Sequence, residues 1–294
     1  MKLIKPSFEI IEQQSREVGM LKHIETCGRV AWKSEERITN DSYLKFVEML
    51  KGVNHGSVLE HGTVYLKINN SYNDYNSKAS KYRFNEYSKS NQELSEDAKI
   101  IRNYITTNYR VLVENNWLDD LKYQCEPTKY HEKRVTVKIV CDRGVSHEFV
   151  RHRTFSFTQE STRYCNYSKD KFGNELTFII PCWSNDLEEG SYNYSDENGT
   201  WITNNYSTIE TDNKIFLNHL GNCEYTYFML LKGYWKPQQA RSVLPNSLKT
   251  ELIMTGFISD WKHFFHLRTA IGAHPQAQEI AIPLEQKFIQ LGLL

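Results

Sequence analysis

The sequence lacks an excess of charge of either sign. Lysine plus arginine and aspartate plus glutamate each total 36 in 294 residues, so the formal net charge is zero. General nucleic-acid binders normally carry a basic excess, so no nucleic-acid partner is expected. Any phosphate that the chain binds must instead be met by a local cluster of cations.

Paired cysteines, an apolar leader and long apolar runs are also missing. The six cysteines include no C-x-x-C pair, and the first residues, MKLIKPSFEI, form no apolar segment. No apolar run approaches the roughly 18 residues that a membrane helix needs. These absences predict reduced thiols, a cytoplasmic location and no membrane partner. The chain also has no G-x-G-x-x-G fingerprint, so a Rossmann dinucleotide unit is not expected.

What the chain does contain is patterning typical of one α+β domain over residues 1–294. We expect a mixed or antiparallel sheet flanked by helices. Two polar stretches, at about 70–130 and 183–212, lack regular periodicity and predict surface insertions. The second is rich in Asn, Tyr and Ser.

Alternation of apolar and polar residues predicts the strands. The segments 3–11, 63–68 and 134–141 alternate, and the last two are also rich in β-branched residues. We expect those two to pair, which would make residues 69–133 an insertion between neighbours in one sheet. A helix is expected within it, over 96–115.

Helical periodicity and end signals predict the helices. Asp41 or Ser42 can cap a helix that Gly52 ends. Ser146 can cap a helix that follows Gly144 and runs to residue 152. Further helices are expected over 214–234, between Pro237 and Pro245, over 259–268 with Ser259 as cap, and from Pro283 onward.

The most informative stretch runs from Arg151 to Tyr164, RHRTFSFTQESTRY. It holds three arginines, whose planar guanidinium groups suit phosphate or carboxylate and stay charged at any working pH. Phe155 and Phe157 alternate with polar residues, so we expect them to face the core while the polar residues face a cleft. On these residues alone, a solvated basic surface is an equal alternative.

The spacing of several motifs resembles that of flavin-dependent thymidylate synthases. Arg151-His152-Arg153 is followed after seven residues by Ser161 and, two positions later, by Arg163. Four more segments match the family in consistent order between about 28 and 282: GRVAW at 28–32, HGSVLEH at 55–61, ARSVLP at 240–245, and WKHFFHLR at 261–268 with His274 and Gln278 after it.

The resemblance implies reductive methylation of dUMP to dTMP. Methylenetetrahydrofolate would supply the carbon, and FAD, reduced by NADPH, would carry the hydride. In such an enzyme the cofactor carries the difficult step while the protein supplies orientation and charge. The resemblance also implies a homotetramer in which FAD lies between subunits.

The same resemblance assigns roles to particular residues. Those expected to bind the cofactor are Ser57, Glu60, Arg151, His152, Arg153, Gln159, His263, Leu267 and His274. Those expected to bind dUMP are Glu148, Arg151, Gln159, Glu160, Ser161, Thr162, Arg163, Arg241 and Arg268. Arg241, His55 and Ser161 are expected at the reaction centre, where Arg241 would stabilise negative charge that develops on the uracil. Ser161 is not assigned as a nucleophile, because no Ser-His-Asp spacing surrounds it.

Three other readings of the sequence compete with this one. His147-Glu148 and His152 nearly spell the H-E-x-x-H motif of zinc hydrolases, but histidines five residues apart do not share a helical face, so no metal is expected. An RNA-binding module could use the arginines and the many tyrosines. Thiol chemistry at Cys141 or Cys165 lacks a histidine partner by spacing, so structural cysteines are favoured.

Overall fold

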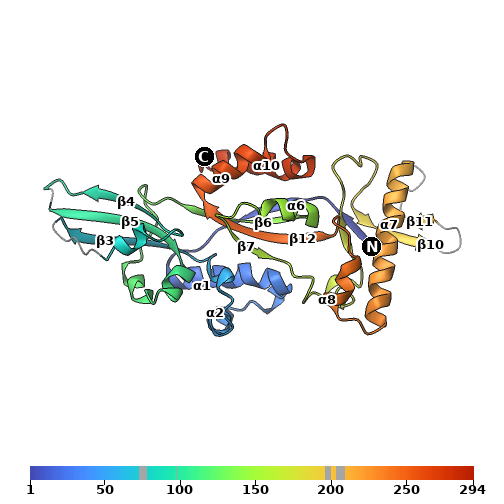
Figure 1. The fold of residues 1–294 in the computed structure, drawn as a ribbon, viewed down its shortest axis with the longest axis horizontal. Helices are drawn as coiled ribbons and strands as arrows, with labels where there is room; N and C mark the ends of the chain where they lie inside the picture. Colours follow the sequence, from blue (N-terminus) through green and yellow to red (C-terminus); the bar gives the residue numbers. More distant parts are fainter. Residues whose placement is uncertain (73–77, 98, 196–199, 203–208) are drawn as a thin grey trace.

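A four-stranded antiparallel sheet forms the middle of the molecule (Figure 1). In the computed structural model its order is β2 (Ser7–Ile11), β6 (Arg134–Asp142), β12 (Lys249–Phe257) and β7 (Ser156–Gln159). β6 and β12 pair along their whole length, from Arg134 opposite Phe257 to Asp142 opposite Lys249. The arginine-rich stretch from Arg151 to Tyr164 includes β7, which is an edge strand of this sheet.

The structure describes residues 1–72, 78–97, 99–195, 200–202 and 209–294. Within these ranges, no helix combines the length and the apolar character needed to cross a bilayer. All six cysteines are free thiols.

Helices cover both faces of the central sheet (Figure 1). Helices α6 (Arg143–Phe149), α9 (Ile258–Arg268) and α10 (Pro275–Gln290) lie on one face, and α1 (Arg16–Arg29) lies on the other. The first face buries the main apolar core, which includes Val137, Ile139, Leu252, Met254, Phe149, Trp261, Phe264, Phe265, Leu284 and Phe288. Burial of these side chains is the main driving force for the three-layer arrangement.

One glycine permits a close contact inside this core. A Cβ atom at Gly256 of β12 would lie 2.6 Å from the ring of Phe155. The ring of Phe155 also packs edge-on against Trp261 at 4.7 Å between centroids. Phe155 is buried and Phe157 packs against the same core, as their alternation with polar residues predicted.

A second sheet projects from one end of the molecule (Figure 1). Its order is β3 (Thr63–Ser71), β5 (Ile100–Asn108) and β4 (Lys89–Leu94), all antiparallel. The core of this sheet is shared with α1 and with α2 (Ser42–Gly52). The short helices α3 (Gly56–Leu59), α4 (Ser80–Arg83) and α5 (Tyr109–Glu114) complete this end.

The opposite end is built on a long helix and a small mixed sheet. α7 (Thr211–Lys232) and the short α8 (Pro237–Ala240) pack with the sheet β8 (Thr177–Ile179), β1 (Lys2–Ile4) and β9 (Gly190–Ser191). β1 runs parallel to β8 and antiparallel to β9. β10 (Asn193–Ser195) and β11 (Thr200–Ile202) pair as a separate two-stranded antiparallel sheet.

Much of the predicted framework is confirmed. The fold is α+β with mixed and antiparallel sheets, and strands cover 63–68 and 134–141. Helix α2 follows Asp41 and ends at Gly52, α7 covers all but the last two residues of the predicted 214–234, and α8 starts at Pro237. The predicted insertion at 183–212 falls partly outside the described residues.

Three predictions about strands were wrong. Residues 3–11 form two strands in different sheets, because Pro6 lies between them and has no N–H to donate to a ladder. Of the helix predicted over 96–115, only Tyr109–Glu114 is helical, as α5; residues 100–108 are a strand, because β5 is the middle strand between β3 and β4, and this pairing outweighs local propensity. β3 does not pair with β6, so residues 69–133 are not an insertion between neighbours in one sheet.

Three predicted helix starts were also misplaced. Asp142, not Ser146, caps α6, since its Oδ1 accepts from the Val145 amide at 2.7 Å. At α9 the amide of Phe257 donates to Asp260, so Ser259 lies inside the first turn. α10 begins at Pro275, and Pro283 lies inside the helix rather than at its start. Strand β12 and helix α1 were not predicted at all.

A chain of buried imidazoles and hydroxyls crosses the central sheet. His61, fully buried, contacts Thr255 Oγ1 through Nδ1 at 2.7 Å and Thr158 Oγ1 through Nε2 at 3.0 Å. Thr255 Oγ1 lies 2.8 Å from Thr136 Oγ1, which lies 3.0 Å from His23 Nε2. Burial, aided by the charge of Arg134, lowers the pKa of His23 to about 4, and burial lowers the pKa of His61 well below its usual range. Both imidazoles are therefore neutral at pH 7.

We expect these two histidines to make the fold sensitive to acid. In the unfolded chain each imidazole binds a proton near pH 6.5, whereas in the folded chain it does so only at lower pH. Stability is therefore fully present above about pH 6.5 and is lost as the pH falls toward 4, by roughly 2 kcal/mol for His23 at pH 5. Thermal unfolding between pH 7.5 and 5 measures this loss.

The matched variants are His23→Gln and, as a control, His266→Gln at an exposed position of α9. His23→Gln should flatten the fall of the unfolding midpoint with acid, whereas His266→Gln should leave it unchanged. A midpoint profile that is equally steep in all three proteins would contradict the assignment to His23.

Candidate active site

The end of α9 meets the end of α6 at an arginine cluster. Arg268 Nη1 donates to Glu148 Oε2 at 2.7 Å, and Arg268 Nη2 donates to the Glu148 carbonyl at 2.8 Å. Arg268 Nε donates to His152 Nε2 at 3.0 Å. His152 and Glu148 lie 116 and 120 positions from Arg268 in the chain, and the three residues meet because α6 and α9 cover the same face of the sheet.

His152 is held as a neutral hydrogen-bond acceptor. Its ring is buried, lies 5.0 Å from that of Phe264 and lies 6.0 Å from that of His263, between centroids. Burial, together with the nearby charges of Arg268 and His263, lowers the pKa of His152 to about 4. Since Nε2 accepts from Arg268, the ring proton lies on Nδ1.

Two exposed arginines flank this buried histidine. Arg151 and Arg153 both expose their side chains at the turn that follows α6. Exposed guanidinium groups on either side of a fixed neutral imidazole can receive a phosphate without first breaking a buried ion pair. His263 and Leu267, on the same helix as Arg268, are also exposed.

The loop after β7 is held by side-chain and backbone hydrogen bonds. Gln159, the last residue of β7, donates from its side-chain Nε2 to Ser146 Oγ at 2.9 Å and to Thr250 Oγ1 at 3.2 Å. The Ser161 amide donates to the Ala31 carbonyl at 3.0 Å. Arg241 Nη1 reaches Thr162 Oγ1 at 3.3 Å from 79 residues away. The structure thus brings Arg241 to the arginine-rich loop, while Arg163 of that loop is exposed.

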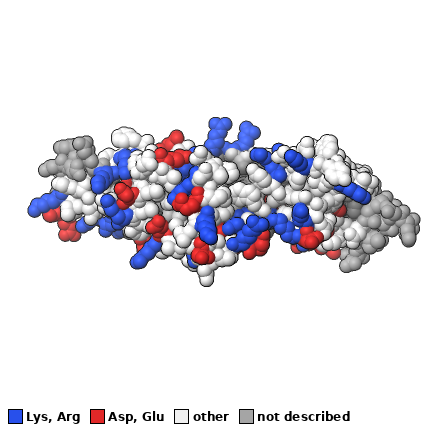
Figure 2. Space-filling model, turned by 90° about the horizontal axis from the view of Figure 1, so that it is seen from below, with Lys and Arg blue, Asp and Glu red and all other residues white. Residues whose placement is uncertain are grey.

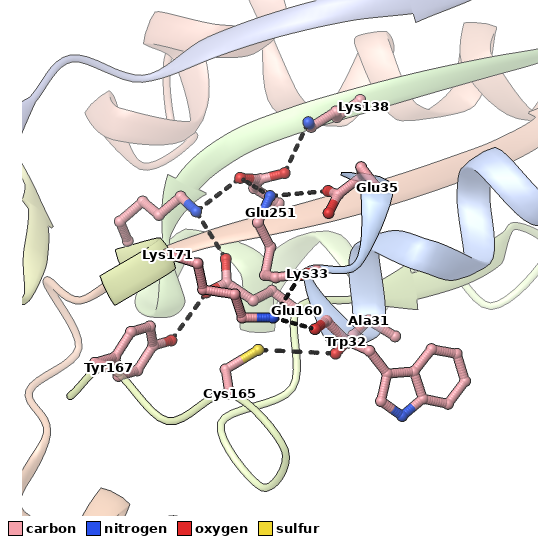
Figure 3. A network of polar contacts seen from close by, with 11 residues as sticks. Ala31, Trp32, Lys33, Glu35, Lys138, Glu160, Cys165, Tyr167, Lys171 and Glu251 are labelled. Carbon is pink, nitrogen blue, oxygen red and sulfur yellow. Dashed lines mark hydrogen bonds and ion pairs between the residues drawn. The ribbon is translucent and has the colours of Figure 1, made fainter. Parts of the chain in front are cut away.

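Glu160, by contrast, turns its side chain inward. One carboxylate oxygen accepts from Tyr167 Oη at 2.9 Å (Figure 3), and the other accepts from Lys249 Nζ at 2.8 Å. The residue is 2 % exposed, so both oxygens are occupied in the interior rather than offered to a ligand. Sequence reasoning placed Glu160 in direct contact with substrate, and this geometry favours an indirect role instead.

Trp32 connects two of the predicted segments. Its ring stacks on His55 at 6.1 Å and lies 6.2 Å from the ring of Tyr164, between centroids. His55 and Ser57 are exposed at the start of α3, and the Glu60 carboxylate pairs with Arg110. His274 lies apart from these residues, at the start of α10 and beside Trp183 at 6.1 Å.

Sequence reasoning missed the lysines behind the loop. Lys33, Lys138 and Lys249 converge on Glu251 from three different elements, at 2.7–2.8 Å. Nothing in their spacing along the chain indicates this meeting, because it depends on the register between β6 and β12. Trp32 was visible in a motif, but its position between His55 and Tyr164 was not.

The structure also bears on the three rival readings. Glu148 and His152 both engage Arg268, and no group of three His, Cys, Asp or Glu side chains suited to a metal occurs within the described ranges. Burial raises the pKa of Cys165 to about 12 and raises that of Cys141 further, which leaves both thiols protonated at pH 7. Figure 2 shows both signs of charge interspersed along one face of the molecule.

Removing the Arg268 charge should change the titration of His152. In Arg268→Ala we expect the pKa of His152 to rise from about 4, because a nearby positive charge that opposes protonation is lost, while burial continues to hold the pKa below 6.5. An NMR titration of the imidazole carbon-bound protons measures the change. Lys262→Ala, at an exposed cation on the same helix, is the control. An unchanged His152 titration in Arg268→Ala would show that Arg268 does not set this pKa.

Comparisons with known proteins agree with the motif pattern. A family model described as thymidylate synthase complementing protein matches residues 114–291. The chain is 28 % identical over 153 residues to the flavin-dependent thymidylate synthase of Corynebacterium efficiens, covering 50 % of this chain and 54 % of the relative. It is 32 % identical over 145 residues to the enzyme of the same name from Corynebacterium diphtheriae, covering 48 % and 50 %. The chain thus spans about half the length of the curated relatives that it matches.

Among solved structures, the chain is similar to a UMP/dUMP methylase, PolB, from Streptomyces cacaoi, bound with 5-Br dUMP. The identity is 16 %, the TM-score is 0.44, and the match covers 99 % of this chain and 93 % of the other. The family prediction is confirmed by the family model, whose match takes in more than half of the sequence. The chain belongs to the thymidylate synthase complementing protein family.

Proposed function

We propose that this chain is a flavin-dependent thymidylate synthase, a methyltransferase that converts dUMP to dTMP. Methylenetetrahydrofolate is the carbon donor, and FAD, reduced by NADPH, is the hydride carrier. The observation that carries the proposal is the meeting of Arg241 with the loop residue Thr162. This contact joins two motifs of the family from distant parts of the chain.

The residues around His152 fit a flavin nucleotide. Arg151 and Arg153 expose two guanidinium groups suited to its phosphates, and His152 is fixed between them as a neutral ring. His55 and Ser57 offer an exposed imidazole and an exposed hydroxyl at the start of α3. His263, Leu267 and Gln159 are proposed to complete the cofactor site, with Glu60 and His274 at its edges. When bound, the reduced flavin supplies the hydride.

The substrate phosphate is proposed to bind at Arg163 and Arg241. A nucleotide monophosphate is nearly a dianion, and two converging arginines can bind it in a chain with no net charge. Arg241, on the short turn Arg241–Val243, is exposed and donates a hydrogen bond to the loop residue Thr162. It can also stabilise negative charge that develops on the uracil.

Arg268 and Glu148 are proposed to orient the same substrate. Arg268 uses three of the five N–H groups of a guanidinium on Glu148 and His152, which leaves two for a ligand. Arg151 and Gln159, which the resemblance assigns to both ligands, are proposed to serve both. Ser161 receives no nucleophilic role, since its Oγ accepts from the backbone amide of Arg163 at 3.3 Å, and an amide is not a general base.

We further propose that the site is completed by other copies of the chain in a homotetramer. The cofactor residues Arg151, Arg153, His55 and Ser57 are exposed in the single chain, and a buried flavin would need further walls. The cytoplasmic location stays a prediction from the sequence.

The direct test is dTMP formation by the purified protein. It is mixed anaerobically with dUMP, methylenetetrahydrofolate and NADPH, with and without FAD, while the flavin absorbance is followed. We expect dTMP only when flavin is present and reduced. A folded protein that binds no flavin and forms no dTMP would refute the proposal.

Arg241→Ala should abolish dTMP formation while FAD stays bound. The substitution removes the cation proposed to bind the substrate phosphate and to stabilise the negative charge that develops on the uracil. We therefore expect turnover to fall at least about 100-fold. Bound flavin is measured by its absorbance and turnover by dTMP release. Arg37→Ala, at an exposed arginine of the Glu35–Arg37 turn, is the control and should retain both. Loss of flavin together with activity in Arg241→Ala would show that Arg241 serves the cofactor instead.

A further inference from the structure

A network of buried charges lies on the interior side of residues 160–163, the substrate loop, and Figure 3 labels its members Lys33, Lys138, Glu160 and Glu251. Lys249 Nζ donates to Glu160 Oε2 at 2.8 Å and to Glu251 Oε1 at 2.7 Å. Glu251 also receives Lys33 at 2.8 Å and Lys138 at 2.7 Å. These charges come from the loop, from β6, from β12 and from the turn after α1, so the network joins four parts of the fold.

The network is largely removed from water. The side chains of Glu160, Glu251 and Lys249 are 1 %, 8 % and 16 % exposed. Burial disfavours the charged form of Lys249, but the carboxylates of Glu160 and Glu251 outweigh it and raise the pKa of Lys249. Burial tends to raise the pKa of Glu251, but the charges of Lys249 and Lys33 outweigh burial and lower this pKa. The ion pairs are therefore intact at pH 7.

The loop is attached to this network at its first residue. The Glu160 amide donates to the Glu251 carbonyl at 2.8 Å, and the next amide, that of Ser161, donates to Ala31. Lys171 Nζ in turn donates to the Lys33 carbonyl at 2.7 Å. The backbone that precedes Thr162 and Arg163 is therefore fixed from the interior side, while Arg163 itself is exposed.

We propose that Glu160 and Lys249 form a positioning pair for the substrate loop. The pair holds the start of the loop against the sheet, so that Ser161, Thr162 and Arg163 are presented to dUMP in a fixed arrangement. Neither Glu160 nor Lys249 contacts the substrate. This inference rests on the proposed function and adds to it the residues that set affinity for dUMP.

The first test is Lys249→Met, which removes the charge and keeps the length of the side chain. It leaves the Glu160 carboxylate buried with Tyr167 as its remaining partner, and a buried charge without its counter-ion is strongly unfavourable. We expect the loop to shift, KM and Kd for dUMP to rise about tenfold, and kcat to stay within about twofold, because binding is lost equally in ground and transition states. Flavin content should not change.

The double variant Glu160→Gln/Lys249→Met separates a charge pair from a general loss of packing. Removing both charges leaves no unpaired carboxylate, so we expect its KM for dUMP to lie closer to the wild-type value than that of Lys249→Met. Glu160→Gln alone should raise KM by about threefold, since it keeps the shape of the side chain. Glu48→Gln, which breaks an exposed ion pair with Lys51 of the same 2.8 Å length, is the control and should match the wild type.

The results are read from dUMP affinity by calorimetry, steady-state kinetics and flavin absorbance on the same samples. An unchanged dUMP affinity in Lys249→Met, or a double variant as weak as the single one, would overturn the inference. A loss of flavin and kcat with unchanged KM would reduce the pair to a structural role and overturn the inference too.

If Lys249→Met does not fold, the KM of Glu160→Gln for dUMP decides instead. A folded wild type that neither binds dUMP nor forms dTMP would refute the proposed function itself, whereas an active wild type with unaffected variants refutes only the pair.

Discussion

The pairing of β12 with β6 is the interaction on which the rest of the structure depends. It joins Arg134–Asp142 to Lys249–Phe257 along nine residues and places one face of both strands under α9 and α10. The opposite face carries the buried threonines and the carboxylate of Glu251. A slip of one residue would exchange these two faces, so the apolar core and the polar network specify the register together.

Charge inside this protein is tolerated because it is shared. Glu251 lies among three lysines, and Arg268 binds both a carboxylate and an imidazole. A charged group buried alone in the interior would lose the favourable free energy of its hydration. Here the partner charges and hydrogen bonds replace that hydration. Neutral His23, His61 and His152 follow the same logic in reverse, since burial without a carboxylate partner keeps them uncharged.

The second sheet, β3-β5-β4, shares its apolar core with α1 and α2. It reaches the body of the protein through Lys89, which pairs with Glu132 and lies over the ring of Phe257 at 4.6 Å. Since α3, with His55 and Ser57, leads directly into β3, the sheet also supports one side of the proposed cofactor site. Its packing therefore bears on the geometry of the site as well as on stability.

The sequence by itself determined the family and the α+β class, because ordered motifs such as Arg151–Arg163 and Ala240–Pro245 are readable without coordinates, and it supplied the site residues as predictions. It also determined strands whose alternation is strong, such as 63–68 and 134–141. It did not reveal β12, because Lys249 and Glu251 give this central strand a polar pattern that only their buried partners explain. Nor did it reveal which strands pair, or that Glu160 turns away from the loop surface toward Lys249. Those facts depend on contacts between residues far apart in the chain, which local periodicity and spacing do not encode, and the tertiary structure alone decided them.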